Sequence, residues 1–306
     1  MTIGEHLTEF GGFRVQQWEP GQPLGDTATT IHRIAVDYDD ETSWTDKFRA
    51  FLALPGVEES QGFVVGMWDV EAGTDADPAP MIEALVAAHA QLSGIKTLFI
   101  GDITYEENEV SWITQGDLSP VLAAYPHLTH LGIRGGNGLS LGRIDLPELR
   151  ELIIQAGGLS AEVVREVVTA ELPRLEHLEL YLGTEDYGST NAADDLTPLL
   201  DGSRFPALKY LGVKNSEHQD EIAQMFAHAP ILDQLDVLDL SLGTLTDEGA
   251  AALLDSERVK TLKKLVLTHH FCTEGMMEKL DALPLEVDTS DHQDDEDDWR
   301  FVALGE

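Results

Sequence analysis

One apolar pattern recurs along this 306-residue chain and constrains its fold more than any other feature. Leucine, isoleucine or valine fills the first, fourth and sixth positions of a six-residue motif. The motif occurs at residues 31–36, 95–100, 128–133, 149–154, 175–180, 208–213, 235–240 and 262–267. From residue 95 onward, successive starts are 33, 21, 26, 33, 27 and 27 residues apart. Self-similarity at this period indicates a stack of structurally similar repeats.

Each repeat predicts a short strand followed, in most cases, by a helix. The last apolar positions of the motif alternate with positions expected to face solvent, which is typical of a strand. Ser160 and Thr246 are expected helix N-caps, each followed by acidic residues and then an apolar stripe. Parallel strands about 4.8 Å apart cannot stack straight beside helices that need about 8–10 Å, so the stack bends. The prediction is an α/β solenoid, or horseshoe, with a concave parallel sheet and convex helices.

Residues 235–254 read LDVLDLSLGTLTDEGAAALL and resemble a repeat of the ribonuclease-inhibitor-like leucine-rich-repeat class. The whole chain is similar to a bacterial group of leucine-rich-repeat proteins that is largely uncharacterised. The resemblance implies a recognition scaffold and no known chemistry. The asparagine that ends the family's consensus strand is missing, which predicts irregular turns after the strands. The positions that would hold it are Gly136, Gly183, Ser216, Gly243 and His270.

The repeats predict one solenoid domain over residues 1–306. Residues 1–30 are expected to form an amino-terminal cap, and residues 31–94 less regular first repeats. Residues 95–288 hold the regular repeats, and residues 289–306 an acidic loop followed by a capping strand at 299–304. The 21-residue step leaves little room for a helix between Arg134 and Leu149, so an extended crossover is expected there.

The net charge of −37, from 19 basic and 56 acidic side chains, argues against phosphate backbones and anionic membranes as partners. It favours a basic or mixed partner, although solubility or adaptation to salt explains it equally well. A single cysteine, Cys272, fits a reducing compartment. The first residues do not resemble a signal peptide, and no apolar run is long enough to span a membrane. We therefore expect a cytoplasmic monomer.

Two repeats are longer than the others, with acidic insertions at residues 102–112 and 183–191. Equivalent positions in a solenoid project from the same edge, where insertions often flank a binding face. Tolerated surface loops are the alternative interpretation.

The polar positions of the motif are expected to point into the concave face, where neighbouring strands place them side by side. Aromatic and arginine side chains of the kind that anchor protein interfaces gather in the central repeats. An ordinary mixed-charge solvent face is the other interpretation. The candidate partner-binding residues are His130, Arg134, His177, Glu179, Tyr181, Tyr210, Lys214 and Asp239.

No motif predicts catalysis or a cofactor. The acidic runs at residues 37–41 and 291–298 lack the glycine and spacing of a calcium-binding EF-hand loop. The glycine-rich residues 135–138 lack the lysine of a phosphate-binding loop. Cys272 lies near two histidines but is more typical of packing than of nucleophilic chemistry. A metal held by His130, His177 and Glu179 is disfavoured, because the two histidines are expected about 9.6 Å apart.

The sequence therefore favours a non-catalytic scaffold that binds a partner protein through its concave sheet and acidic edge loops. One alternative is a small-molecule or metal-binding protein, or an accessory enzyme, that uses the central His, Glu and Tyr residues. A second is an acidic mimic of nucleic acid.

Overall fold

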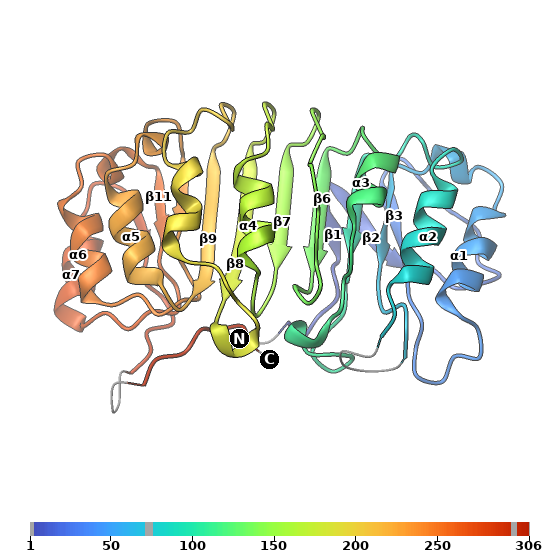
Figure 1. The fold of residues 1–306 in the computed structure, drawn as a ribbon, viewed down its shortest axis with the longest axis horizontal. Coiled ribbons are helices and arrows are strands. Elements are labelled where there is room, and N and C mark those ends of the chain that lie inside the picture. The colour runs from blue at the N-terminus through green and yellow to red at the C-terminus, as the bar shows by residue number, and fades with distance from the viewer. Residues whose placement is uncertain (1–2, 71–75, 295–298, 306) are drawn as a thin grey trace. The chain divides into compact units, whose positions relative to one another are not determined.

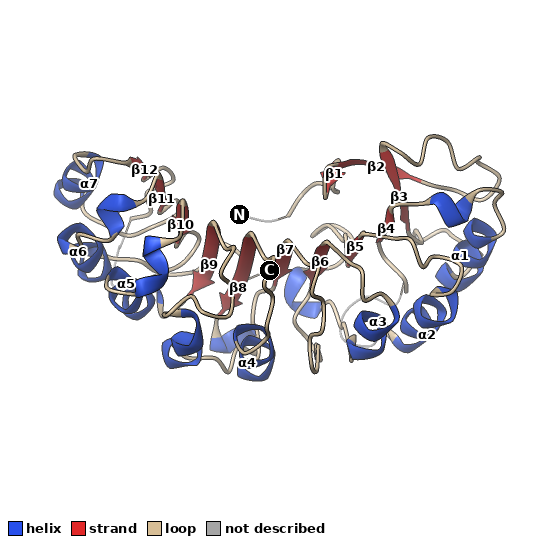
Figure 2. Cartoon of the chain, turned by 90° about the horizontal axis from the view of Figure 1, so that it is seen from above, coloured by secondary structure: helices blue, strands red, loops and turns tan. Residues whose placement is uncertain are grey.

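A computed structural model describes residues 3–70, 76–294 and 299–305. It divides into two compact units, Ile3–Ile154 and Gln155–Gly305, which we name the amino-terminal unit and the carboxy-terminal unit (Figure 1). Each unit is a sheet with helices along one face (Figure 2). We call the opposite sheet face the inner face of that unit. The expectation of a single continuous domain stays a prediction.

The strands of the amino-terminal unit follow chain order within its sheet. A two-residue turn at Gly11 and Gly12 joins the first two strands as an antiparallel hairpin, and the second to sixth strands pair in parallel. The strands are β1 (Glu9–Phe10), β2 (Phe13–Gln17), β3 (Thr30–Ile34), β4 (Gly62–Val65), β5 (Thr97–Ile100), β6 (His130–Arg134) and β7 (Glu151–Gln155), which ends at the unit boundary.

Helices cover one face of this sheet. Ser43 caps the first of them by accepting a hydrogen bond from the backbone N–H of Asp46. The helices are α1 (Trp44–Leu52), α2 (Ala79–Ala88) and α3 (Ser119–Ala124), with short 3-10 turns η1 (Val57–Glu59) and η3 (Val110–Trp112). Residues 135–150 contain no helix, which confirms the extended crossover predicted for the 21-residue step.

The carboxy-terminal unit repeats the strand and helix alternation more regularly. Its strands β8 (His177–Gly183), β9 (Tyr210–Ser216), β10 (Val237–Asp239), β11 (Lys264–Val266) and β12 (Glu286–Asp288) pair in parallel. Its helices are α4 (Ala161–Val168), α5 (Gln219–Ala227), α6 (Asp247–Asp255) and α7 (Glu274–Asp281). The 3-10 turns are η4 (Glu185–Tyr187), η5 (Ala193–Leu199), η6 (Pro230–Asp233) and η7 (Val259–Thr261). Ser160 and Thr246 cap α4 and α6, as predicted.

The leucines of the motif form the core between sheet and helices. Leu98, Leu131, Leu178, Leu211 and Leu238 stand at the fourth position and are buried. Parallel strands in chain order, each presenting the same apolar positions to a helical layer, are the leucine-rich-repeat architecture. The predicted α/β fold class is confirmed. No helix in the described part of the chain is long and apolar enough to cross a bilayer.

The predicted register of the first repeat is wrong by two residues. His32 pairs with Phe63, which pairs with Leu98, so His32 rather than Ile34 takes the core-facing fourth position. Ile31 is apolar for another reason: it is buried on the inner face beneath Phe10. The periodicity cannot distinguish these two ways of burying an isoleucine.

The turns after the strands are more regular than predicted. In three successive repeats of the carboxy-terminal unit, the eighth position has a left-handed conformation: Asn215, Leu242 and His269 have φ values of 58°, 68° and 57°. Their backbone N–H groups donate to the carbonyls of Ser241, Thr268 and Ser290 in the next turn. Backbone hydrogen bonds therefore continue the ladder past the strand ends, where the family consensus would use asparagine.

The carboxy-terminal residues dock, but not as the predicted strand. Ala303 N–H donates to the Leu242 carbonyl, and Leu304 exchanges two hydrogen bonds with the Asn215 amide. The last described strand is instead β12, which the sequence did not predict. Part of the predicted acidic loop, residues 295–298, lies outside the described residues.

Candidate protein-recognition surface

The eight candidate partner-binding residues fall into both units. His130 and Arg134 lie on β6 in the amino-terminal unit. The other six lie on β8, β9 and β10 of the carboxy-terminal unit, where they form one contact network: His177, Glu179, Tyr181, Tyr210, Lys214 and Asp239.

An aromatic pair marks the inner face of the carboxy-terminal unit. The strand register places His177 beside Tyr210, and their rings stack with centroids 4.0 Å apart and planes 6° apart. His177 Nε2 lies 2.8 Å from Glu179 Oε1, two residues along the same strand. The side chain of His177 is 28% exposed, so the stacked pair can be reached from solvent.

Charged side chains next to this pair form a network of ion pairs and hydrogen bonds. Lys214 Nζ lies 3.3 Å from Glu179 Oε2 and 3.1 Å from Asp239 Oδ2, and 5.0 Å from the centre of the Tyr181 ring. The Tyr210 hydroxyl donates a 2.5 Å hydrogen bond to Asp239 Oδ2. Buried ion pairs with additional hydrogen bonds hold side chains in one arrangement. The side chains of this face are therefore held in one arrangement before any ligand binds.

Three groups of this network have pKa values shifted away from neutral pH. Burial raises the pKa of Tyr210, and the charges of Asp239 and Glu179 raise it further. Burial by itself lowers the pKa of Lys214, but Tyr181, Glu179 and Asp239 outweigh it and the pKa is raised. Burial raises the pKa of Glu179, but the His177 hydrogen bond and the Lys214 charge outweigh it and the pKa is lowered. Because a general acid or base needs a pKa near the working pH, these three groups suit recognition better than proton transfer.

Arg134 belongs to a different network, on the inner face of the amino-terminal unit. Its guanidinium donates to the Ile103 carbonyl at 2.8 Å, lies 3.4 Å from Asp102 Oδ1, and sits 5.5 Å from the Phe99 ring centre. Arg134 is buried, so its role here is structural support. His130 lies near Phe10, with ring centroids 6.5 Å apart.

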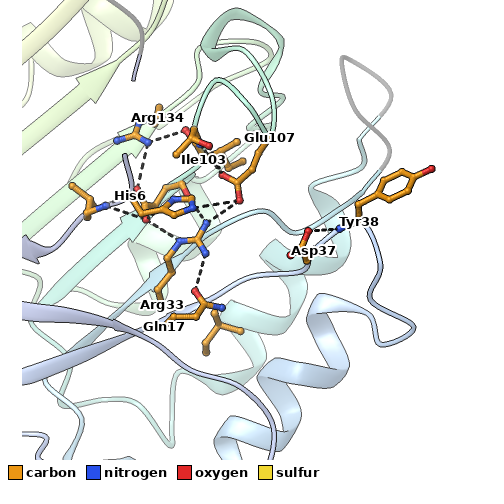
Figure 3. Close-up of polar contacts among 12 residues, drawn as sticks. His6, Gln17, Arg33, Asp37, Tyr38, Ile103, Glu107 and Arg134 are labelled. Carbon is orange, nitrogen blue, oxygen red and sulfur yellow. Dashed lines mark hydrogen bonds and ion pairs between the residues drawn. The ribbon is translucent and has the colours of Figure 1, made fainter. Parts of the chain in front are cut away.

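The role of Asp102 was not predicted from the sequence. The predicted acidic loop at residues 102–112 was expected to be solvent-facing, but the Asp102 side chain is fully buried. Arg33 Nε donates to its Oδ2 at 2.9 Å, and the backbone N–H of Leu7 donates to its Oδ1 at 3.2 Å. Glu107 Oε1 lies 3.3 Å from Arg33 Nη2. Figure 3 shows Arg33 and Glu107 together with His6 and Arg134. An acidic residue directly after a strand, with arginines on neighbouring strands, was the available signal.

The Asp102 carboxylate is held ionised by its neighbours. Burial raises its pKa, but His6, Arg134 and Arg33 outweigh this effect, so the pKa is lowered. The second acidic insertion, residues 183–191, is anchored by Asn191, whose Nδ2 donates to the carbonyls of Leu159 and Leu182. Both insertions are therefore ordered by buried polar contacts at their ends.

The described residues give little support to metal or nucleophilic chemistry. They contain no group of three His, Cys, Asp or Glu side chains arranged to hold a metal ion. Cys272 is buried, and burial raises the pKa of its thiol to about 12, with further contributions from Asp247 and Asp220. A thiol with that pKa is protonated at neutral pH and a poor nucleophile.

Comparison with solved structures gives the family. A protein from Bacteroides fragilis is 36% identical, with a TM-score of 0.81; the alignment covers 90% of this chain and 77% of that one. This chain belongs to the same family as the Bacteroides fragilis protein. An internalin from Listeria monocytogenes is 13% identical over 87% of this chain and 73% of its own, with a TM-score of 0.43. No protein-family model and no curated protein matches the chain. Membership of the ribonuclease-inhibitor-like class stays a prediction.

Proposed function

We propose that this protein is a non-catalytic recognition scaffold that binds a partner protein on the inner face of its carboxy-terminal unit. The supporting observation is the stacked pair of His177 and Tyr210, which is reachable from solvent and braced by Lys214 and Asp239. Aromatic side chains held rigidly at the centre of a face are the usual anchors of protein interfaces. The acidic insertion at residues 183–191 follows β8 and would flank the contact.

The alternative, a small-molecule or metal-binding protein using the His, Glu and Tyr residues, is less well supported. Glu179 and Asp239 already accept contacts from Lys214, and Asp239 also accepts the Tyr210 hydroxyl. A metal or substrate would have to displace these partners and leave Lys214 buried without a counter-charge, which is unfavourable.

The net charge of the chain indicates which kind of partner surface it would bind. At −37, the chain attracts basic or mixed surfaces and repels nucleic acid and anionic membranes. We propose that it acts as a monomer in the cytoplasm, where its one thiol would remain reduced.

The test is binding of a purified partner, identified by affinity capture from the source cytoplasm, to a His177→Ala/Tyr210→Ala variant. Loss of two aromatic anchors should weaken binding at least about tenfold, measured by calorimetry. A Glu162→Ala/Lys279→Ala variant, with both changes on exposed helix positions of the same unit, is the matched control and should bind normally. Equal affinity of the two variants would contradict the proposed face.

A further inference from the structure

The inner face of the amino-terminal unit is occupied by the chain's own first residues. Leu7 and Phe10 pack against Ile31, Val64 and Phe99, with the Phe10 and Phe99 rings meeting edge to face at 5.2 Å. Figure 2 shows β1 on the side of β5 and β6 away from the helices. We call residues 3–10 the resident segment and the face beneath it the groove.

Two glycines allow close packing in and beside the groove. Gly132 lies under the Phe99 ring, where a Cβ would come within 2.1 Å of Phe99 Cδ2. Gly11, at the end of the resident segment, approaches so closely that a Cβ would stand 2.7 Å from Thr97 Oγ1. These two contacts need glycine, and they let the hairpin seat flat on β5 and β6.

The hydrophobic cluster under the resident segment is distinct from the core that binds the helices. Side chains alternate along a strand, so Phe63 packs toward Phe48 of α1, while the adjacent Val64 faces the groove. Phe99 faces the groove in the same way, one residue from the buried Leu98. The segment can therefore leave without opening the helix side of the sheet.

The polar attachment of the segment combines one side chain, His6, whose Nδ1 lies 3.5 Å from Asp102 Oδ2, with main-chain groups that any peptide could supply. The Leu7 N–H reaches the two Asp102 oxygens at 3.2 and 3.4 Å, and the Ile3 carbonyl accepts from the Tyr105 N–H at 3.0 Å. The Thr8 carbonyl accepts from the Val15 N–H at 2.8 Å. These are main-chain contacts of the kind that recognise an extended segment without fixing its sequence.

The receptor side stays assembled by contacts outside the segment. Asp102 is held by Arg33 and Arg134, whose guanidinium groups also donate to the carbonyls of Asp102 and Ile103. His6 and the Leu7 N–H depart with the segment, but the two guanidinium groups remain, so the carboxylate keeps its position. A preformed acceptor lowers the ordering cost of binding a new segment.

We propose that this groove is a peptide-binding site in which residues 3–10 are the resident ligand. It would accept in their place an extended segment of another protein with an aromatic side chain at the Phe10 position and an aliphatic one at the Leu7 position. A backbone N–H of that segment would bind Asp102. The groove lies in the amino-terminal unit, so this inference does not depend on the function proposed for the carboxy-terminal unit.

Native-state hydrogen exchange on the unmodified protein tests whether the resident segment leaves. The N–H groups of Val15 and Tyr105 are bonded to the segment, so their exchange reports its departure. We expect both to exchange through a local opening, at least about tenfold faster than the amides of β5, and with little dependence on low concentrations of urea. Exchange of Val15 and Tyr105 only at the rate of global unfolding would overturn the proposal.

A trans-binding experiment tests the chemistry of the groove. The receptor is the full-length Leu7→Ala/Phe10→Ala variant, whose resident segment is weakened, and the probe is a labelled peptide of residues 3–10. We expect saturable binding to this variant, at least about tenfold weaker binding to the unmodified protein, and a similar loss when the peptide carries Phe10→Ala. Equal binding, or none, to variant and unmodified protein would overturn the proposal; the exchange measurement decides alone if the variant does not fold.

Discussion

The inner faces of the two units use the same strand positions for different purposes. In the amino-terminal unit, the fifth motif position holds Val64 and Phe99, and the chain's own Phe10 covers them. In the carboxy-terminal unit, the fifth position holds Glu179 and Asp239, which belong to a partly accessible ion-pair network. One repeat can therefore present either a covered apolar groove or an open polar face, because inner-face residues are not needed for the core.

The largest effect that distinguishes the faces should come from Asp102. In Asp102→Ala, Arg33 and Arg134 remain buried without their shared carboxylate, and the free energy of unfolding should fall by about 3–5 kcal/mol in a urea titration. Asp288→Ala removes a partly accessible carboxylate from the other inner face and should cost less than about 1 kcal/mol. Similar losses in both variants would mean that the faces do not differ in this way.

Phe10→Ala should have the next largest effect. It removes the aromatic ring that fills the groove, lowering the free energy of unfolding by about 2–4 kcal/mol. Binding of a hydrophobic dye should increase as the groove opens. Trp299→Ala, at a residue that is 70% exposed, should change stability by no more than about 0.5 kcal/mol. If Phe10→Ala were equally mild, the groove would not be held shut by this ring.

Tyr210→Phe should have a smaller effect, in the carboxy-terminal unit. The ring stack on His177 is retained, but Asp239 loses a hydroxyl donor, so we expect a loss of about 1–2 kcal/mol in the same titration. Unchanged stability would show that Lys214 and the Ser241 N–H satisfy Asp239 without the hydroxyl.

The subtlest comparison is the response to acid. Asp102 and Glu179 both have folded-state pKa values below their ordinary range, so each stabilises the fold above its unfolded pKa, and this contribution is lost as pH falls through the folded pKa. Between pH 7 and 3, Asp102→Asn and Glu179→Gln should each reduce the pH dependence of the unfolding free energy. Curves parallel to that of the unmodified protein would contradict the assigned partners.

Local patterns predicted much of the candidate surface. The register placed His177 beside Tyr210 and Glu179 two residues along, because positions repeat from strand to strand. The burial of Arg134 could not be predicted in the same way. Arg134 contacts Asp102, which in turn accepts from the Leu7 N–H, 95 residues earlier in the chain.

The spacing of leucines determined the parallel strands and the helical layer, and Ser160 and Thr246 marked two helix caps, because each signal comes from residues a few positions apart. The tertiary structure decided which inner face is open. It seated residues 3–10 over Phe99 and shifted the register of Ile31 and His32, since burial on that face comes from a distant part of the chain. An apolar residue in a strand predicts burial. Whether it is buried on the inner face or against the helices depends on which segments pack on each face of the sheet.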